Sequence, residues 1–121
     1  MTLISKKNGT LPTVYDLHLQ NKNTMKDIML FPDQDLIHSN IACCRYWMKL
    51  NMSEAYKEIW VHPDHVARTV FTTVLGTFKS QVPQMGDCNA PSTFQHLMTT
   101  IFHDCINCFV HVYMDDIFIL S

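Results

Sequence analysis

The sequence describes a chain of 121 residues in which 47% are hydrophobic and 17% are charged, and this composition excludes an intrinsically disordered protein. The net charge of −2 excludes a global positive field of the kind that attracts nucleic acid. No apolar stretch reaches the ~20 residues that span a bilayer, and no signal-peptide pattern is present, so we expect no membrane partner. Five cysteines are an odd number, typical of reduced thiols, and we expect an intracellular protein.

The first two thirds of the chain predict several strands and one helix. The β-branched and aromatic residues of 11–19 predict a strand after a turn signal. Pro32 is typical of a helix start, and the apolar spacing predicts a helix over 32–42. A strand is predicted over 45–52, after which we expect Ser53 to cap a short helical turn. Further strands are predicted over 57–61, 68–74 and 78–82, and Gly76 predicts a hairpin between the last two.

The clearest helix follows Pro91, which suits a first helical position. Apolar residues then recur at three- and four-residue steps and form one stripe: Phe94, Leu97, Met98, Ile101, Phe102 and Cys105. Two apolar strands follow over 108–114 and 117–120, and only Asp115 and Asp116 remain to make the turn between them. This order predicts one α+β domain over 1–121, with a mainly antiparallel sheet and packed helices.

The adjacent carboxylates of the predicted hairpin need an explanation, because their surroundings are apolar. An ionised carboxylate that leaves water without a partner costs on the order of 5 kcal/mol. A tight turn would direct both carboxylates out at one edge of the sheet, where Mg²⁺ binds such hard oxygen ligands together with substrate phosphates. The simpler alternative is a solvated turn without a metal, and the two residues by themselves favour it.

Four stretches, in order along the chain, resemble reverse transcriptases of gypsy-type LTR retrotransposons: "VYDLHLQNKNT", "KLNMSEAYKEI", "GDCNAPSTFQHLM" and "YMDD". The resemblance implies the fingers and palm elements of a right-hand polymerase, ending in a YMDD hairpin. It also implies RNA-directed DNA synthesis, in which two Mg²⁺ or Mn²⁺ ions support template-directed nucleotidyl transfer. We expect the rest of the palm, the thumb and the ribonuclease H domain to be absent from 1–121.

The resemblance also implies partners and a location. The partners are an RNA or DNA template–primer, deoxynucleoside triphosphates and the remainder of a Pol polyprotein, which comprises thumb, ribonuclease H and integrase. The location is the cytoplasm or a virus-like particle.

The resemblance further implies roles for single residues. Asp115 is the second metal-binding carboxylate, Asp116 is its partner, and Asn51 stands at the position of the first carboxylate. Tyr56 falls where a bulky ring crowds the ribose 2′-hydroxyl, and Gln95 falls where a glutamine lies against the incoming nucleotide. The remaining nucleotide contacts are the backbone amides of Glu54 and Ala55, which face the triphosphate, and the phosphate-binding cations Lys6 and Lys7.

The chain departs from the family pattern most seriously at Asn51. A neutral amide removes one full negative charge from the metal site, so we expect weakened Mg²⁺ binding. Pro12 and His18 stand where relatives carry arginines, which bind phosphate better than proline or neutral histidine. We therefore expect impaired or absent polymerase activity, and we expect the truncated length to act in the same direction. The alternative is a non-catalytic retroelement remnant that binds nucleic acid weakly or not at all.

Plainer roles compete with several of these predictions. Tyr56 could cover the edge of the core, Gln95 could be a solvated helix residue, and Lys6 and Lys7 could belong to a solvated turn. The stretch 103–111 also contains four potential zinc ligands: His103, Cys105, Cys108 and His111. Holding all four around one ion would break the predicted helix and strand, so core thiols and a partnered strand histidine are favoured.

Overall fold

The computed structural model describes residues 2–3 and 13–121, and it describes side chains from residue 15 onward. The chain forms two compact units. Unit 1 contains Met1–Lys26 and Tyr56–Ala90, and unit 2 contains Asp27–Ala55 and Pro91–Ser121. Each unit combines two segments that are distant in the sequence. The interpretation of 1–121 as one partial polymerase domain stays a prediction.

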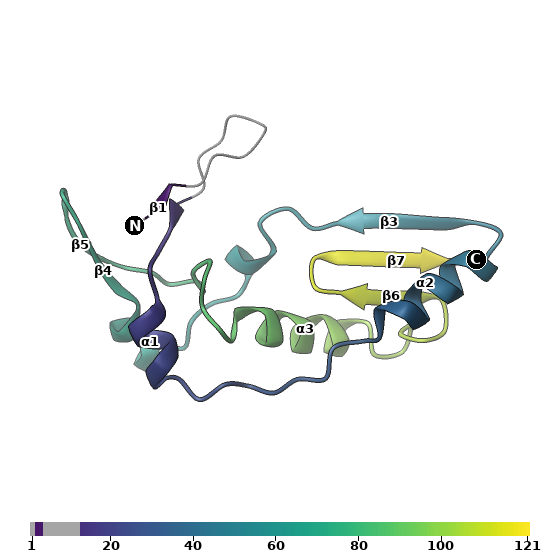
Figure 1. Cartoon of the computed structure of the whole chain (residues 1–121), viewed down its shortest axis with the longest axis horizontal. Helices are drawn as coiled ribbons and strands as arrows, with labels where there is room; N and C mark the ends of the chain where they lie inside the picture. Colours follow the sequence, from purple (N-terminus) through teal and green to yellow (C-terminus); the bar gives the residue numbers. More distant parts are fainter. Residues whose placement is uncertain (1, 4–12) are drawn as a thin grey trace. The chain divides into compact units, whose positions relative to one another are not determined.

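Unit 2 contains a three-stranded antiparallel sheet with β7 in its centre (Figure 1). In order across the sheet, the strands are β3 (Trp47–Asn51), β7 (Asp116–Leu120) and β6 (Val110–Tyr113). Asp116 lies in register with Asn51 on one side and with Tyr113 on the other. The three strands predicted from apolar patterning in this part of the chain are therefore confirmed.

The reversal between β6 and β7 is a two-residue turn made by Met114 and Asp115. Met114 has a φ of 51°, in the left-handed region, and short hairpin turns that match the twist of their strands require a positive φ at the first central position. The prediction that Asp115 and Asp116 form the turn is wrong by one residue. Asp116 is instead the first residue of β7, so its side chain lies on a face of the sheet.

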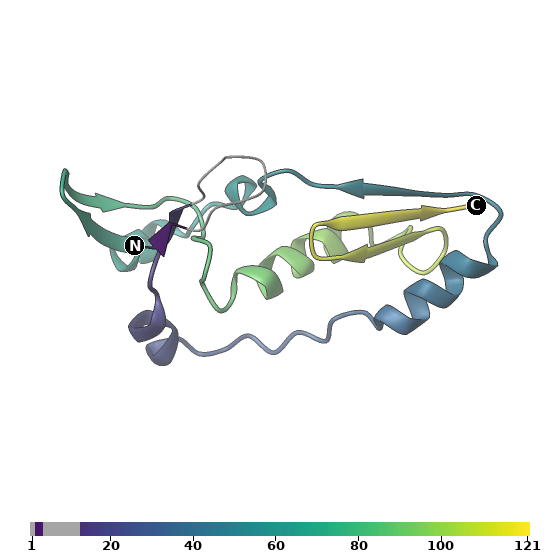
Figure 2. The same cartoon turned by 45° about the horizontal axis from the view of Figure 1, so that its top comes forward.

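Two helices accompany this sheet. Helix α2 (Gln34–Cys43) begins after Asp33, whose side chain accepts a hydrogen bond from the Asp35 backbone N–H at 2.9 Å. Helix α3 (Ala90–Ile101) lies close to the turn end of the β6–β7 hairpin in both views and is hydrogen-bonded to β6 (Figures 1 and 2). The buried apolar residues of unit 2 come from the sheet, both helices and the segment after β3: Ile37, Ala55, Phe94, Met98, Val110, Val112, Ile117 and Leu120.

The apolar stripe predicted on α3 is buried only in part. Phe94 and Met98 are buried, whereas Leu97 and Ile101 are exposed. The polar residue Gln95, which is not part of the apolar stripe, is instead fully buried. Packing against the hairpin therefore selects a different face of α3 from the one that the apolar spacing indicates.

Unit 1 contains short elements. Strands β1 (Thr2–Leu3) and β2 (Thr13–Val14) pair with each other, as do β4 (Val70–Thr73) and β5 (Gly76–Lys79). Its helical elements are α1 (His18–Asn23), η2 (Pro63–Thr69) and most of the 3₁₀ turn η1 (Ala55–Glu58). Among the residues that the structure describes, no helix has the length and apolar character needed to cross a bilayer.

Of the strands predicted in unit 1, the one over 11–19 is confirmed only in part and the one over 57–61 is wrong. Within the described part of the stretch 11–19, only Thr13–Val14 form a strand. The Asp16 carboxylate accepts a hydrogen bond from the His18 backbone N–H at 3.2 Å, and α1 begins at His18. The stretch 57–61 forms the end of η1 and irregular structure, although its apolar residues are typical of a strand. Its Val61 backbone N–H donates to the Gln81 carbonyl at 2.7 Å. The hairpin predicted around Gly76 is confirmed.

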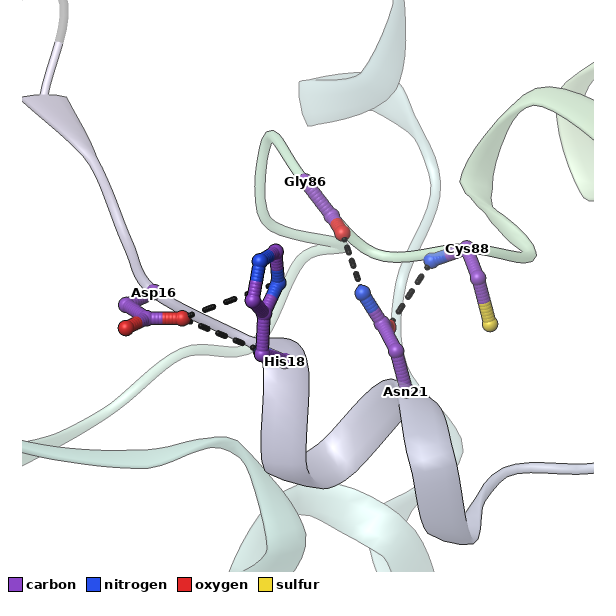
Figure 3. A network of polar contacts seen from close by, with 5 residues as sticks. All are labelled: Asp16, His18, Asn21, Gly86 and Cys88. Carbon is purple, nitrogen blue, oxygen red and sulfur yellow. Dashed lines mark hydrogen bonds and ion pairs between the residues drawn. The ribbon is translucent and has the colours of Figure 1, made fainter.

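Helix α1 is fastened to the segment that precedes α3 by the Asn21 side chain (Figure 3). Its Nδ2 donates to the Gly86 carbonyl at 2.8 Å, and its Oδ1 accepts from the Cys88 backbone N–H at 3.1 Å. Gly86 has a φ of 108°, and a Cβ atom there would lie 3.4 Å from the Tyr15 carbonyl. Only glycine adopts this conformation readily, so Asn21 and Gly86 together determine the path of the chain toward α3.

Candidate active site

The predicted site residues of unit 2 meet where β3 ends beside the β6–β7 turn. Asn51 is the last residue of β3 and lies opposite Asp116. The Met52 backbone N–H donates to the Asp115 carbonyl at 2.9 Å, which connects the segment after β3 to the turn. The structure thus brings Asn51, Asp115 and Asp116 together from parts of the chain 65 positions apart.

Both carboxylate oxygens of Asp116 are engaged by side chains of β3. The Asn51 Nδ2 donates to Oδ1 at 2.9 Å, and the Lys49 Nζ lies 2.8 Å from Oδ2. The hydrogen bond from Lys49, and then that from Asn51, lower the pKa of Asp116 below its usual value of 3.8, while partial burial opposes them. Because this pKa is lowered by folding, the stabilisation is present above the ordinary pKa and is lost as the pH falls through the lowered one.

Asp115 has a different environment. Its Oδ1 is buried and has no hydrogen-bond partner among the described residues. A buried carboxylate oxygen without a partner is costly, and a bound cation is one arrangement that would relieve this cost. Asp115 therefore fits the role of a metal ligand.

The set as a whole does not fit a two-ion site. Two divalent ions in one site need several carboxylate oxygens between them. Here Asn51 presents a donor N–H₂ to Asp116, since only the amide nitrogen can donate to a carboxylate. Asp116 is already paired with a lysine, so Asp115 alone offers a carboxylate oxygen without a partner. Among the described residues, no three His, Cys, Asp or Glu side chains are grouped in a way that could hold a metal ion.

Gln95 connects α3 to the turn. It is 0% exposed, its Nε2 donates to the Val112 carbonyl at 3.1 Å, and its Oε1 accepts from the Met114 backbone N–H at 2.9 Å. The alternative of a solvated helix residue is wrong, because α3 packs this side of the helix against the hairpin. A contact between Gln95 and a nucleotide stays a prediction, and the role that the geometry shows is to hold the turn.

The remaining nucleotide-binding predictions fall in three places. Glu54 is exposed and has a φ of 56°, a left-handed conformation rare outside glycine, while Ala55 is buried. A backbone held in such a conformation next to β3 is compatible with amides that contact a ligand. Tyr56 is half-buried and belongs to unit 1, and its role against the ribose stays a prediction. Lys6 and Lys7 lie outside the described residues, as does Pro12.

The four potential zinc ligands of 103–111 lie in different environments. His111 is buried in β6, and its Nε2 lies 3.2 Å from the Asn40 Nδ2, as expected for a partnered strand histidine. Cys105 is half-buried, but Cys108 is exposed, so the prediction that it is a core thiol is wrong. Cys108 lies in the turns between α3 and β6, where the chain reverses and side chains reach solvent. His103 contacts Asp104 at 3.2 Å.

Lys49 is a site residue that the sequence analysis missed. The signal was present in the strand period, because Lys49 and Asn51 are two residues apart and side chains two apart in a strand share a face. A lysine two residues before the position of a metal-binding carboxylate is therefore expected to lie on the same face of the strand and to reach the same residue of the neighbouring strand, here Asp116.

Comparison with known proteins identifies the family. Residues 8–121 match the model of the family described as "Reverse transcriptase (RNA-dependent DNA polymerase)". The chain belongs to the reverse transcriptase family. It is 30% identical over 108 residues to the "Retrovirus-related Pol polyprotein from transposon 297" of Drosophila melanogaster, covering 89% of this chain and 10% of the relative. It is 31% identical over 118 residues to the "Transposon Tf2-3 polyprotein" of Schizosaccharomyces pombe, covering 98% of this chain and 9% of the relative.

This reverse transcriptase chain therefore spans about a tenth of the length of these curated relatives. Among solved structures, it is similar to the native prototype foamy virus protease–reverse transcriptase, with a TM-score of 0.82 and 21% identity over 98% of this chain and 16% of that one. It is also similar to the foamy viral enzyme in complex with double-stranded DNA, with a TM-score of 0.87 and 19% identity over 98% of this chain and 25% of that one. The predicted α+β palm and fingers fold and the retrotransposon lineage are confirmed, while the gypsy-type subgroup stays a prediction.

Proposed function

We propose that this chain is the fingers and palm part of an RNA-directed DNA polymerase in which nucleotidyl transfer is impaired or lost. Membership of the reverse transcriptase family supports the reaction class. The main support for the impairment is the hydrogen bond that the Asn51 amide donates to Asp116, because Asn51 stands where the family has a carboxylate.

The missing charge at position 51 is the physical cause of the impairment. Two-metal phosphoryl transfer places two divalent cations about 3.5–4 Å apart between carboxylates of separate strands. An aspartate at position 51 would add a third negative charge beside Asp115 and Asp116, whereas asparagine adds none. Mg²⁺ or Mn²⁺ is the expected cofactor, and its binding is weakened because Asp116 is already neutralised by Lys49.

Partners and residue roles complete this proposal. Structures of similar foamy viral enzymes in complex with double-stranded DNA and with an RNA/DNA hybrid support a template–primer as partner. Deoxynucleoside triphosphates are the second substrate. The proposed nucleotide contacts are Tyr56 at the ribose, Gln95 beside the nucleotide, Glu54 and Ala55 through their amides, and Lys6 and Lys7 at the phosphates.

The polyprotein context of the relatives supports further proposed partners and a proposed location. The curated relatives are transposon polyproteins, which supports the remainder of a Pol polyprotein, with thumb, ribonuclease H and integrase, as a further partner. It also supports an intracellular location, in the cytoplasm or a virus-like particle.

Primer extension tests the impairment. Residues 8–121 replace the matching segment of an active relative, either unchanged or with Asn51→Asp. We expect Asn51→Asp to extend a primer at least about 100-fold faster, because it restores a charge that acts on the reacting phosphates. The control Asn23→Asp adds the same charge on exposed α1 and should have no effect. Equal, robust extension by the unchanged and Asn51→Asp versions would contradict the proposal.

The second candidate function is a non-catalytic retroelement remnant. The full engagement of Asp116 by Lys49 and Asn51 favours it, because this arrangement is stable without any cation. It predicts no extension by either version of the chimera.

A further inference from the structure

Lys49 occupies a fixed place between two residues of β7. Its Nζ lies 2.8 Å from the Asp116 Oδ2 and 5.6 Å from the centre of the Phe118 ring. In the strand register, Lys49 is opposite Phe118 and Asn51 is opposite Asp116, so all four side chains share one face of the sheet. The Asp116 carboxylate and the Phe118 ring thus both attract the ammonium group.

This ammonium group provides the positive charge that a metal ion would otherwise bring to Asp116. A divalent cation that bound Asp116 would have to displace Lys49 or approach it within a few ångströms. The Lys49 side chain is 45% exposed and that of Asp116 28%, so water screens this repulsion only in part. Asp115 is not subject to the same competition, since its Oδ1 has no partner among the described residues.

We propose that Lys49 is a positioning residue that keeps Asp116 out of the metal-binding set, so that this site takes at most one divalent cation, through Asp115. The inference rests on the proposed function and deepens it. It separates two obstacles to metal binding: the missing charge at Asn51 and the extra charge at Lys49. Restoring the carboxylate at position 51 removes only the first of them.

Mn²⁺ binding to the 121-residue chain tests this inference without any need for activity. Electron paramagnetic resonance of free Mn²⁺ gives the number of bound ions and the dissociation constant. We expect at most one weakly bound ion in the unchanged chain. In Lys49→Met we expect the dissociation constant to fall by about tenfold, as for the removal of a partly screened like charge. The double variant Lys49→Met with Asn51→Asp should bind two ions, the second about tenfold more tightly than in Asn51→Asp by itself.

Three further variants control for folding and for overall charge. Lys49→Gln is neutral and can still donate to Asp116, so it should reproduce the gain in affinity even if Lys49→Met folds poorly. Lys49→Arg keeps the charge and should restore the original dissociation constant. Lys79→Met removes the same charge from β5, in unit 1, and should leave Mn²⁺ binding unchanged.

The possible results distinguish this inference from the proposed function. Two Mn²⁺ ions in the unchanged chain would overturn it, as would dissociation constants of folded Lys49→Gln and Lys49→Met within about twofold of the original. If Asn51→Asp then still rescued primer extension, the proposed function would stand while the role of Lys49 was rejected. Gains in affinity with Lys49→Gln and Lys49→Met, reversed in Lys49→Arg, would support the inference whatever the primer-extension result.

Discussion

The two carboxylates of the hairpin are adjacent in the sequence but differ in their surroundings. Asp116 has a hydrogen-bonded partner for each oxygen and a lowered pKa. Asp115 carries a buried oxygen without a partner among the described residues. In the absence of a divalent cation, Asp116 therefore stabilises the fold, whereas burial of the Asp115 Oδ1 without a partner opposes it.

Exchanging each carboxylate for its amide separates these contributions. Asp115→Asn should raise the free energy of unfolding by about 1 kcal/mol, because a neutral amide is less costly to bury than an unpaired charge. Asp116→Asn should lower the free energy of unfolding by about 1 kcal/mol, because the ion pair with Lys49 that it removes is partly exposed and contributes no more than this. Urea unfolding at pH 7 without divalent cations measures both. Changes of the same sign in the two variants would show that the carboxylates have equivalent environments.

At the level of elements, the hairpin depends on α3 as well as on its own turn. A non-glycine residue with a φ of 51°, such as Met114, adopts an unfavourable conformation that persists only where neighbouring groups hold it. Gln95 supplies that restraint by bonding the carbonyl of one β6 residue and the N–H of the first turn residue. The position of Asp115 is thus controlled from a helix outside the hairpin.

Removing this connection should loosen the turn. Gln95→Leu leaves the Val112 carbonyl and the Met114 N–H without these partners inside the protein, and we expect a loss of about 2–3 kcal/mol in the free energy of unfolding. The matched control is Gln81→Leu at an exposed position, which should change stability by less than about 0.5 kcal/mol. Hydrogen exchange of the Met114 amide gives a local readout: it should become much faster in Gln95→Leu. Unchanged exchange would show that Gln95 does not hold the turn.

For the whole molecule, charge limits binding to nucleic acid. The chain has nine Lys and Arg residues against eleven Asp and Glu residues. Affinity for nucleic acid comes largely from basic side chains that neutralise phosphates and release counterions. Even with a polymerase fold, a chain of this composition has little general attraction for a template–primer.

We therefore expect weak binding of an RNA/DNA primer–template by the 121-residue chain, with a dissociation constant above about 10 µM at roughly 150 mM salt. Fluorescence anisotropy of a labelled hybrid duplex measures it, and the slope of affinity against salt counts the phosphates that are neutralised. Submicromolar affinity at this salt concentration would contradict the expectation and would point to a locally concentrated basic surface.

By itself, the sequence determined the family and the main elements of unit 2. Strands β3, β6 and β7 and helices α2 and α3 all follow from apolar periodicity and local start signals, which depend on residues a few positions apart. The YMDD stretch and the blocks before it identified the polymerase lineage for the same reason, because such motifs are local. They also predicted that Asn51 would lie beside the carboxylate pair.

Tertiary structure decided what periodicity could not express. The loss of a strand at 57–61 and the buried face of α3 depend on neighbours that no local pattern specifies. The one-residue shift of the turn follows from the register of the β6–β7 hairpin, which Gln95 of α3 holds. The pairing of Asp116 with Lys49 and Asn51 arises from a strand register between residues 65 or more positions apart. Which carboxylate is neutralised and which keeps an unpaired oxygen is an electrostatic outcome of that register, so only the folded chain could reveal it.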